Sequence, residues 1–367
     1  MRFVLPPKAD DGDFIYAPYL RCKGSAYSCH DNQVSFRLVD FTILGTPINK
    51  IPESLGVRPQ AMKMKFATPN PNAIFLKNFI QTNAAVEQVA KRTGTSLNNQ
   101  ILHRAFIGET ISLIYLPLVS KDDHLFDAVT DDPLTEFINP ASELEQLTSH
   151  NYDWKPGTIP NICPECGWDL SGNRDSVVMS CKNCESFWEA RGKSFRRVAF
   201  STYACRDNNA IFLPFWKIQV REDTLPINSL ADFIRVTNQP IAVRDGWAGM
   251  PMNIWVPAFK ITPKIFLRLG SRLTIGQRLL IPEEKYPELP IQPINLHRKE
   301  AIQSLKIILA SAAANKRDII SKLSQISFSV EGIELALIPF TDNAYSLYNE
   351  ETKLNVNKQT LKYGRFL

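Results

Sequence analysis

Apolar residues interrupted by a single proline recur along this chain and mark its predicted strands. The clearest case is IFLPFWKI at 211–218, in which Pro214 has no N–H to donate to a sheet ladder. The same pattern surrounds Pro18, Pro117, Pro257 and Pro339. Because a central strand normally excludes proline, the pattern predicts strands that bend or lie at a sheet edge at these points.

Helical periodicity marks two segments. NAAVEQVAKRTG at 83–94 predicts a helix that ends at Gly94, a suitable C-cap. RKEAIQSLKIILASAAANKRDIISKL at 298–323 predicts an amphipathic helix, which we expect to pack across a sheet rather than to form a groove for a partner. The apolar stripe of this helix consists of Ile302, Leu305, Ile308, Leu309 and Ala312.

The order of these elements repeats along the chain. A proline-containing strand, a proline-rich link, a helix pattern and a second proline-containing strand occur in the N-terminal part and again in the C-terminal part. We therefore predict an α+β fold with two related β-rich modules, at 1–145 and 196–367, that arose by internal duplication. A zinc ribbon at 155–195 is predicted to be inserted between them. The alternative is chance recurrence in a chain that holds 25 prolines and 16 glycines.

The segment CPECGWDLSGNRDSVVMSCKNC has the cysteine spacing of a zinc ribbon, C-x2-C-x14-C-x2-C. Each CxxC turn directs two sulfurs at one point, and Gly167 follows the second ligand, where a left-handed residue is often needed. The segment resembles the rubredoxin-like zinc ribbons over residues 163–190. The predicted metal ligands are Cys163, Cys166, Cys181 and Cys184. The residues expected to cover the site are Trp168, Leu170, Val177 and either Phe187 or Trp188.

The expected cofactor is a structural Zn²⁺ ion, because four thiolates close a tetrahedral site. The same ligands also suit a single iron, as in rubredoxins, and this alternative stays open. Thiolate ligands must stay reduced, which favours a cytoplasmic location. The other cysteines, Cys22, Cys29 and Cys205, are expected to be ordinary buried thiols.

Composition favours a soluble protein over a dedicated nucleic-acid binder or a membrane protein. A chain of 367 residues with 44% hydrophobic and 22% charged residues is typical of a soluble protein with two or three domains. The net charge of +5 is too mild to indicate a dedicated nucleic-acid binder. No stretch approaches the roughly 18–20 apolar residues of a membrane span, and the first residues do not have the pattern of a signal peptide.

Signatures of catalysis are missing from the sequence. We find no phosphate-binding glycine loop, no HExxH and no GxSxG. The acidic run at Asp10, Asp11 and Asp13 lacks the further ligands of an EF-hand and is expected to be a solvated turn. We therefore name no catalytic residue and lean toward a non-enzymatic protein. The histidines, all expected to be surface or packed residues, are His30, His103, His124, His150 and His297.

Over its whole length the chain resembles a family of uncharacterised bacterial proteins with a central rubredoxin-like zinc ribbon. The resemblance rests on APY near the start, SLG-x-R-x-Q-A from Ser54 to Ala61, the CPxCGW…CxNC ribbon, and LPFWK. It implies the fold and a cytosolic location, and it assigns no activity.

Three functions follow as hypotheses. The first is a scaffold or adaptor that presents aromatic residues to an unidentified protein partner, because aromatic residues are favoured interface anchors. The second is nucleic-acid binding through a basic surface formed by Lys63, Lys65, the run RGKSFRR at 191–197 and the segment from Lys260 to Arg272. The third is rubredoxin-like electron transfer. The aromatic residues meant in the first hypothesis are Phe215, Trp216, Trp247 and Trp255.

Overall fold

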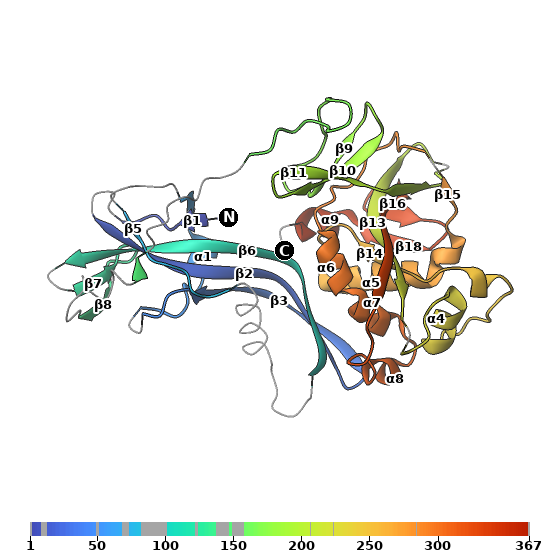
Figure 1. Cartoon of the computed structure of the whole chain (residues 1–367), viewed down its shortest axis with the longest axis horizontal. Coiled ribbons are helices and arrows are strands. Elements are labelled where there is room, and N and C mark those ends of the chain that lie inside the picture. The colour runs from blue at the N-terminus through green and yellow to red at the C-terminus, as the bar shows by residue number, and fades with distance from the viewer. Residues whose placement is uncertain are drawn as a thin grey trace. The chain divides into compact units, whose positions relative to one another are not determined.

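The computed structural model has a strand-rich α+β fold (Figure 1). It describes residues 2–8, 13–48, 51–67, 73–81, 101–121, 124–136, 147–148, 158–205, 207–222, 224–283 and 285–365. The predicted helix at 83–94, Asp10, Asp11 and His150 lie outside these residues. The chain divides into two compact units. Unit 1 comprises Met1–Gly24, Leu38–Thr95 and Glu109–Gly157, and unit 2 comprises Ser25–Arg37, Ser96–Gly108 and Thr158–Leu367.

The first sheet contains the strands of the N-terminal part of the chain. These are β1 (Arg2–Val4), β2 (Phe14–His30), β3 (Gln33–Leu44), β4 (Lys65–Phe66), β5 (Ile74–Phe75), β6 (Ile101–Lys121), β7 (His124–Asp127) and β8 (Pro133–Glu136). Their order is β3-β2-β6-β1-β4, with β5 beside β2 and the pair β7–β8 beside β6. Most neighbours whose pairing is described are antiparallel, but β1 runs parallel to β6 and β5 runs parallel to β2. The short helix α1 (Arg58–Ala61) precedes β4.

Unit 2 contains the other two sheets. The ribbon sheet has the order β11-β10-β9, from β9 (Val178–Cys181), β10 (Ser186–Arg191) and β11 (Ser194–Val198). The larger sheet has the order β14-β13-β16-β12-β15, and β17 and β18 extend it from β16. Its strands are β12 (Phe200–Tyr203), β13 (Ala210–Arg221), β14 (Asn253–Pro257), β15 (Pro282–Glu283), β16 (Ser329–Asp342), β17 (Ser346–Asn349) and β18 (Leu354–Asn357).

The two large sheets have the same pattern of neighbours. The parallel pair β1–β6 of the first sheet corresponds to the parallel pair β12–β16 of the second. The parallel contact of Tyr16 with Phe75 corresponds to that of Phe212 with Ile291. The hairpins β7–β8 and β17–β18 also correspond, because each turn contains one residue with left-handed backbone. This residue is Asp131 in the first hairpin and Lys353 in the second. The two large sheets therefore have the same strand topology.

Four of the prolines lie in the inner strands β2, β6, β13 and β16, so of the two alternatives predicted, a bend or a sheet edge, the edge is wrong for these strands. Pro214 is paired with Leu337 in β13, which has β14 on one side and β16 on the other. Its carbonyl accepts a hydrogen bond from the N–H of Ala258 at 3.0 Å, immediately after β14 ends. Because the N–H and C=O of one residue face the same neighbour in an antiparallel ladder, the missing N–H of Pro214 points to where β14 ends. The Ala258 carbonyl, which would accept that N–H, instead accepts the N–H groups of Asn295 and Leu296 at 3.1 Å.

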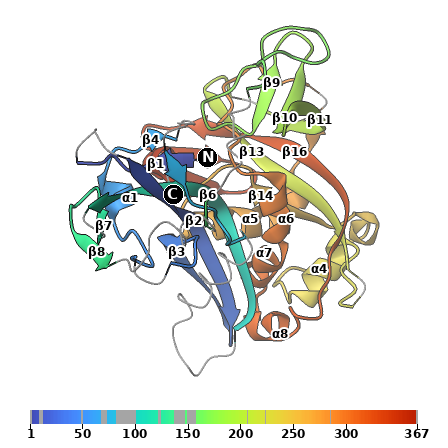
Figure 2. The same cartoon turned by 60° about the vertical axis from the view of Figure 1, so that its left-hand side comes forward.

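Helices of unit 2 pack beside β14, where Figure 2 shows α5, α6 and α7 together. Helix α5 (Pro263–Gly276) contacts both β14 and α7. At Gly270 a Cβ atom would lie 2.8 Å from Ile308 Cδ1 and 2.9 Å from the Trp255 carbonyl oxygen, so glycine permits this close approach. The remaining helices are α4 (Leu230–Val236), α6 (Arg298–Gln303), α7 (Leu305–Ala312), α8 (Lys316–Ile320) and α9 (Lys358–Gly364).

The single helix predicted over 298–323 is divided into α6, α7 and α8. Four residues of its predicted stripe, Leu305, Ile308, Leu309 and Ala312, are buried as expected. Ile302, in α6, is 37% exposed, and Ser304 ends α6 and begins α7. The hydroxyl of Ser304 donates to the Ala301 carbonyl at 2.7 Å, so this polar side chain is satisfied inside the core.

Unit 1 contains two ion pairs that the sequence did not reveal, one formed by the SLG-x-R-x-Q-A segment and one that contacts it. Arg58, at the start of α1, pairs with Asp127, whose side chain is almost fully buried. The Asp127 carboxylate also accepts the backbone N–H of Val129 at 2.9 Å. Arg21 binds Asp40 through two hydrogen bonds of 2.7 Å. Burial opposes the charge of Asp40, but hydrogen bonds from Arg21 and Gln60 lower its pKa below the usual value.

We predict that Arg58→Ala destabilises unit 1 by about 3 kcal/mol or more, because it leaves the buried Asp127 carboxylate without its cation. Hydrogen exchange measured by mass spectrometry should become faster in β6 and β7 and stay unchanged in β13 and β16. Adding Asp127→Asn to the variant should recover part of the protection. Lys121→Ala is the matched control, since the Lys121–Asp131 pair is half exposed and contributes about 1 kcal/mol at most. Equal effects of Arg58→Ala and Lys121→Ala would contradict the prediction.

Candidate metal centre

The four predicted ligands converge in the structure. The Sγ atoms of Cys163, Cys166, Cys181 and Cys184 all lie within 4.8 Å of one another. Cys163 and Cys184 are 3.5 Å apart, and Cys166 and Cys181 are 3.4 Å apart, measured between Sγ atoms. Around a tetrahedral zinc ion with Zn–S bonds of about 2.3 Å, neighbouring sulfurs are about 3.8 Å apart. Four thiols at these separations could hold one metal ion.

Two similar turns bring the thiols together. Gly167 follows Cys166 with φ of 73°, and Glu185 follows Cys184 with φ of 50°. This left-handed conformation reverses the chain directly after each second ligand. In the first turn the N–H of Gly167 donates to the Cys163 carbonyl at 3.0 Å. The left-handed glycine that the sequence predicted is therefore present, and the second turn has the same form without glycine.

Thiols this close cannot all ionise unless a cation is present, because like charges oppose one another. Hydrogen bonds from the Asn183 side chain and the Trp168 backbone lower the pKa of Cys166 to about 6. The Ser186 hydroxyl favours the thiolate of Cys184, but burial and the three neighbouring thiols outweigh it and raise the pKa of Cys184 to about 12. A bound cation would remove this opposition, since metal binding displaces the thiol protons. The donor set therefore fits a metal ion.

A small apolar cluster surrounds the thiols. Leu170 is 3% exposed and Trp188 is 8% exposed, and both pack with Cys163 and Cys181. The Trp188 indole N–H donates to the Ser186 hydroxyl at 2.7 Å, and that hydroxyl lies 3.0 Å from the Cys184 sulfur. The hydroxyl thus links the indole to a thiol.

The other predicted covering residues have different roles. Trp168 is 60% exposed and does not cover the thiols. Phe187 is buried in the larger core of unit 2, and Val177 packs against the same core. Alternate residues of β10 point to opposite faces of the ribbon, which is why Phe187 and Trp188 enter different clusters.

A segment that we call the strap, Tyr286–Leu296, connects the ribbon to the rest of unit 2. The N–H of Val177 donates to the Ile294 carbonyl at 2.8 Å. The Phe187 ring contacts the ring of Tyr286, with centroids 5.7 Å apart. Asp175 accepts a hydrogen bond from Asn295 at 2.7 Å and pairs with Arg365 near the C-terminus. The sequence showed the strap only as a proline-rich link, because nothing in its composition reveals the strand that it contacts.

The basic run at 191–197 is partly neutralised. Arg196 pairs with Glu189, a carboxylate that is only 7% exposed. Arg298 approaches the same carboxylate at 3.4 Å, and His297 approaches it at 3.8 Å. Burial acts against ionisation, but the hydrogen bonds from His297 and Arg196 lower the pKa of Glu189 below its usual value. Arg197 pairs with Glu165 on the surface.

The remaining predicted residues are placed as follows. Phe215, Trp216, Trp247 and Trp255 are all buried in the core of unit 2, so they do not form an exposed aromatic edge. Lys264, Arg268 and Arg272 are exposed at four-residue steps along α5, and Lys63 and Lys65 are exposed in unit 1. Burial lowers the pKa of His103 to about 4, as expected for a packed histidine. Cys22 and Cys29 are buried, whereas Cys205 is half-buried.

Comparison of the chain with protein-family models, with curated proteins and with solved structures found no match. The family resemblance therefore rests on the quoted motifs alone. Across the described parts of the chain, no helix combines the length and apolar character that a membrane crossing requires.

We predict that Glu189→Gln destabilises the ribbon by about 2 kcal/mol at neutral pH, because it removes a charged partner from two arginines. The folded pKa of Glu189 is lowered, so its contribution is present above the ordinary value of 4.5 and is lost as the pH falls through the folded value. Hydrogen exchange at 186–198, corrected for intrinsic rates, should show this loss in the wild type and a weaker pH dependence in the variant. Glu288→Gln, in an exposed pair with Lys285, is the control. The same pH dependence in wild type and Glu189→Gln would argue against this role.

Proposed function

We propose that the protein is a non-enzymatic adaptor whose ribbon is held by one structural Zn²⁺ ion. The observation that carries the proposal is the convergence of four thiols, because four protein ligands complete a tetrahedral site and leave no position for a substrate. A structural zinc ion supplies folding free energy to a segment too small for a core of its own. The ribbon fits this role, since its own apolar cluster has few residues besides the cysteines.

Zinc is preferred to iron on the chemistry of the site. Zinc does not change oxidation state, so a four-thiolate zinc site needs no access for an electron donor or acceptor. Iron in the same ligands would make the protein an electron carrier, the reading that the resemblance to rubredoxins keeps open. The two metals are distinguished by colour and by elemental analysis.

The partner surface that we propose is the outer side of the first cysteine turn. Ile162 is 48% exposed and Trp168 is 60% exposed. The N–H of Cys163 donates to the Trp168 carbonyl at 2.7 Å, and Ile162 is paired with Asp169. Backbone hydrogen bonds and the metal ligands thus hold both exposed side chains in place. Because tryptophan is enriched among the residues that dominate interface energies, we propose that Trp168 enters an apolar pocket of a protein partner.

Internal duplication is the origin that we propose for the two large sheets. The shared strand order, the shared parallel pairs and the matching positions of the prolines support it. In both sheets a proline lies two residues after the end of the parallel pairing. In β6, Pro117 follows Tyr115, and in β16, Pro339 follows Leu337. In this scheme the ribbon is an insertion between two copies of one module.

Nucleic-acid binding is the second candidate. Lys264, Arg268 and Arg272 lie on one exposed face of α5, because residues at four-residue steps share a helix face. Three cations in a row could contact successive phosphates, and such binding weakens steeply with salt. The ion pairs of Arg196 and Arg197 with acidic residues count against a contribution from the run at 191–197.

For the metal, we predict that the protein purified under reducing conditions is colourless and contains one zinc ion per chain. Cys181→Ser should lose the metal, because it removes one of the four thiolate ligands, and this one is buried. Cys205→Ser is the control and should retain the metal, since Cys205 lies outside the cluster. Elemental analysis of the three proteins is the measurement. A red protein that contains iron in place of zinc would overturn the proposal in favour of electron transfer.

For the partner, we predict that a protein cross-linked and co-purified from the native host is lost with Trp168→Ala and retained with Tyr345→Ala. Tyr345 is 83% exposed and distant in sequence, so it controls for the loss of any surface aromatic residue. Quantitative mass spectrometry should show a depletion of about tenfold or more, the effect of removing one dominant anchor. Equal recovery by both variants would refute the role of Trp168. Loss of all bound material on nuclease treatment would favour the nucleic-acid candidate.

A further inference from the structure

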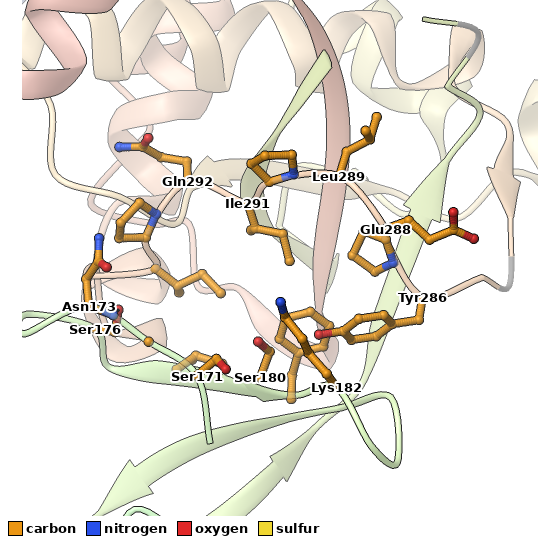
Figure 3. A pocket seen from close by; sticks show the side chains of 17 residues that line it. Ser171, Asn173, Ser176, Ser180, Lys182, Tyr286, Glu288, Leu289, Ile291 and Gln292 are labelled. Carbon is orange, nitrogen blue, oxygen red and sulfur yellow. Dashed lines mark hydrogen bonds between the residues drawn. The ribbon is translucent and has the colours of Figure 1, made fainter. Parts of the chain in front are cut away.

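A cavity of about 530 Å³ lies between the ribbon and the strap, within unit 2. Its volume is within the usual range of small-molecule sites. One wall is the stretch of ribbon between the two cysteine turns, and the other is the strap (Figure 3). None of the four cysteines lines the cavity, although Ser180 and Lys182 flank Cys181 in the sequence.

The cavity combines an apolar floor with polar walls. Val178, Phe187 and Ile294 are buried and supply apolar surface. Hydroxyl groups come from Ser171, Ser176 and Ser180 on the ribbon side and from Tyr286 on the strap side. The Tyr286 phenol forms a hydrogen bond with the Ser180 side chain, and burial raises its pKa further above the ordinary value of 10. An apolar floor with a few convergent polar groups is the usual composition of a ligand site.

The lining contains two charged residues, Lys182 and Glu288, and both are exposed. The Lys182 side chain points into the space between the ribbon and the strap (Figure 3). It forms no ion pair with any residue that the structure describes. Glu288, the acidic residue of the lining, pairs with Lys285 at 2.7 Å, and this cation lowers the pKa of Glu288. Of the two charged side chains in the lining, Lys182 is therefore the one that no described acidic residue pairs with.

From these observations we infer that the cavity between the ribbon and the strap binds a compact organic anion, a carboxylate or a phosphate monoester on an apolar body. Lys182 binds the anionic group, because an ammonium group forms strong charge-assisted hydrogen bonds with either anion. The serine and tyrosine hydroxyls orient the ligand, and the apolar floor receives its body.

The strap makes the cavity stable in shape. Phe212 donates its N–H to the Pro290 carbonyl at 2.9 Å, and Gln292 donates its N–H to the Phe212 carbonyl at 2.9 Å. Prolines at 287, 290 and 293 restrict the backbone between these bonds. A wall that is ordered before the ligand binds lowers the entropy cost of binding.

The test uses the full chain with its metal and the fluorescent probe 8-anilinonaphthalene-1-sulfonate, an aromatic anion. The neutral probe N-phenyl-1-naphthylamine serves as its uncharged counterpart. We expect Lys182→Met to weaken binding of the anionic probe about tenfold and to leave the neutral probe nearly unchanged, since only the charged contact is lost. Lys193→Met, in the exposed turn between β10 and β11, is the matched control and should bind both probes as the wild type does.

A second variant fills the cavity. The Ile291 side chain also points into the space (Figure 3), so Ile291→Trp should abolish binding of both probes while its backbone contact with Phe212 is kept. Displacement of the anionic probe by phenyl phosphate or by phenylacetate identifies the preferred anion. The inference is overturned if neither compound displaces the probe, if Lys182→Met binds like Lys193→Met, or if Ile291→Trp still binds. Zinc content measured on every variant separates loss of this site from loss of the metal centre.

Discussion

The long ladder between β13 and β16 is the constraint on which the rest of unit 2 depends. It runs from Ala210 paired with Thr341 to Arg221 paired with Ser329, with one irregularity near Gln219. Residues on both faces of these strands are buried, among them Phe215, Trp216 and Phe340. Because a shift of one residue would exchange the two faces, the apolar surface packed on each side specifies the register. Helix α6 packs against β13, helices α5 and α7 pack against β14, and the strap is hydrogen-bonded to Phe212 of β13.

Proline is tolerated in this ladder because the ladder has a gap on one side. β14 pairs with β13 only from Phe215 to Gln219. At Phe212 the residue that pairs with β13 is Ile291 of the strap. Pro214 stands between these two neighbours, where no backbone carbonyl needs its N–H. The carbonyl of Pro339 in the partner strand likewise turns outward and accepts a hydrogen bond from the Asn349 side chain at 2.8 Å. The prolines thus mark positions at which a strand exchanges one neighbour for another.

Buried polar groups show how the two large sheets differ in spite of their common scheme. Asp127 in the first sheet is an acidic residue paired with Arg58, whereas Asn349 at the corresponding hairpin position is a neutral amide. The side-chain oxygen Oδ1 of Asn349 accepts the backbone N–H of Thr352 at 2.9 Å. In the same way, the Asp127 carboxylate accepts the backbone N–H of Val129. A neutral amide satisfies the hairpin without a cation, so the second sheet needs no counterpart of the Arg58 ion pair. In the ribbon, burial likewise opposes the charge of Glu189, and hydrogen bonds from His297 and Arg196 favour it.

By itself the sequence determined the α+β class, the proline-containing strands and the convergence of the four cysteines. These features depend on short spacings: two residues between thiols, a left-handed residue after the second of them, and alternation within single strands. Only the tertiary structure decided which strands are neighbours, that Trp216 is core while Trp168 is exposed, and that the strap closes a cavity against the ribbon. Burial and charge compensation depend on partners far away in the chain, as with Arg58 and Asp127. The identity of such partners follows from the register and packing of whole sheets, which no local pattern contains.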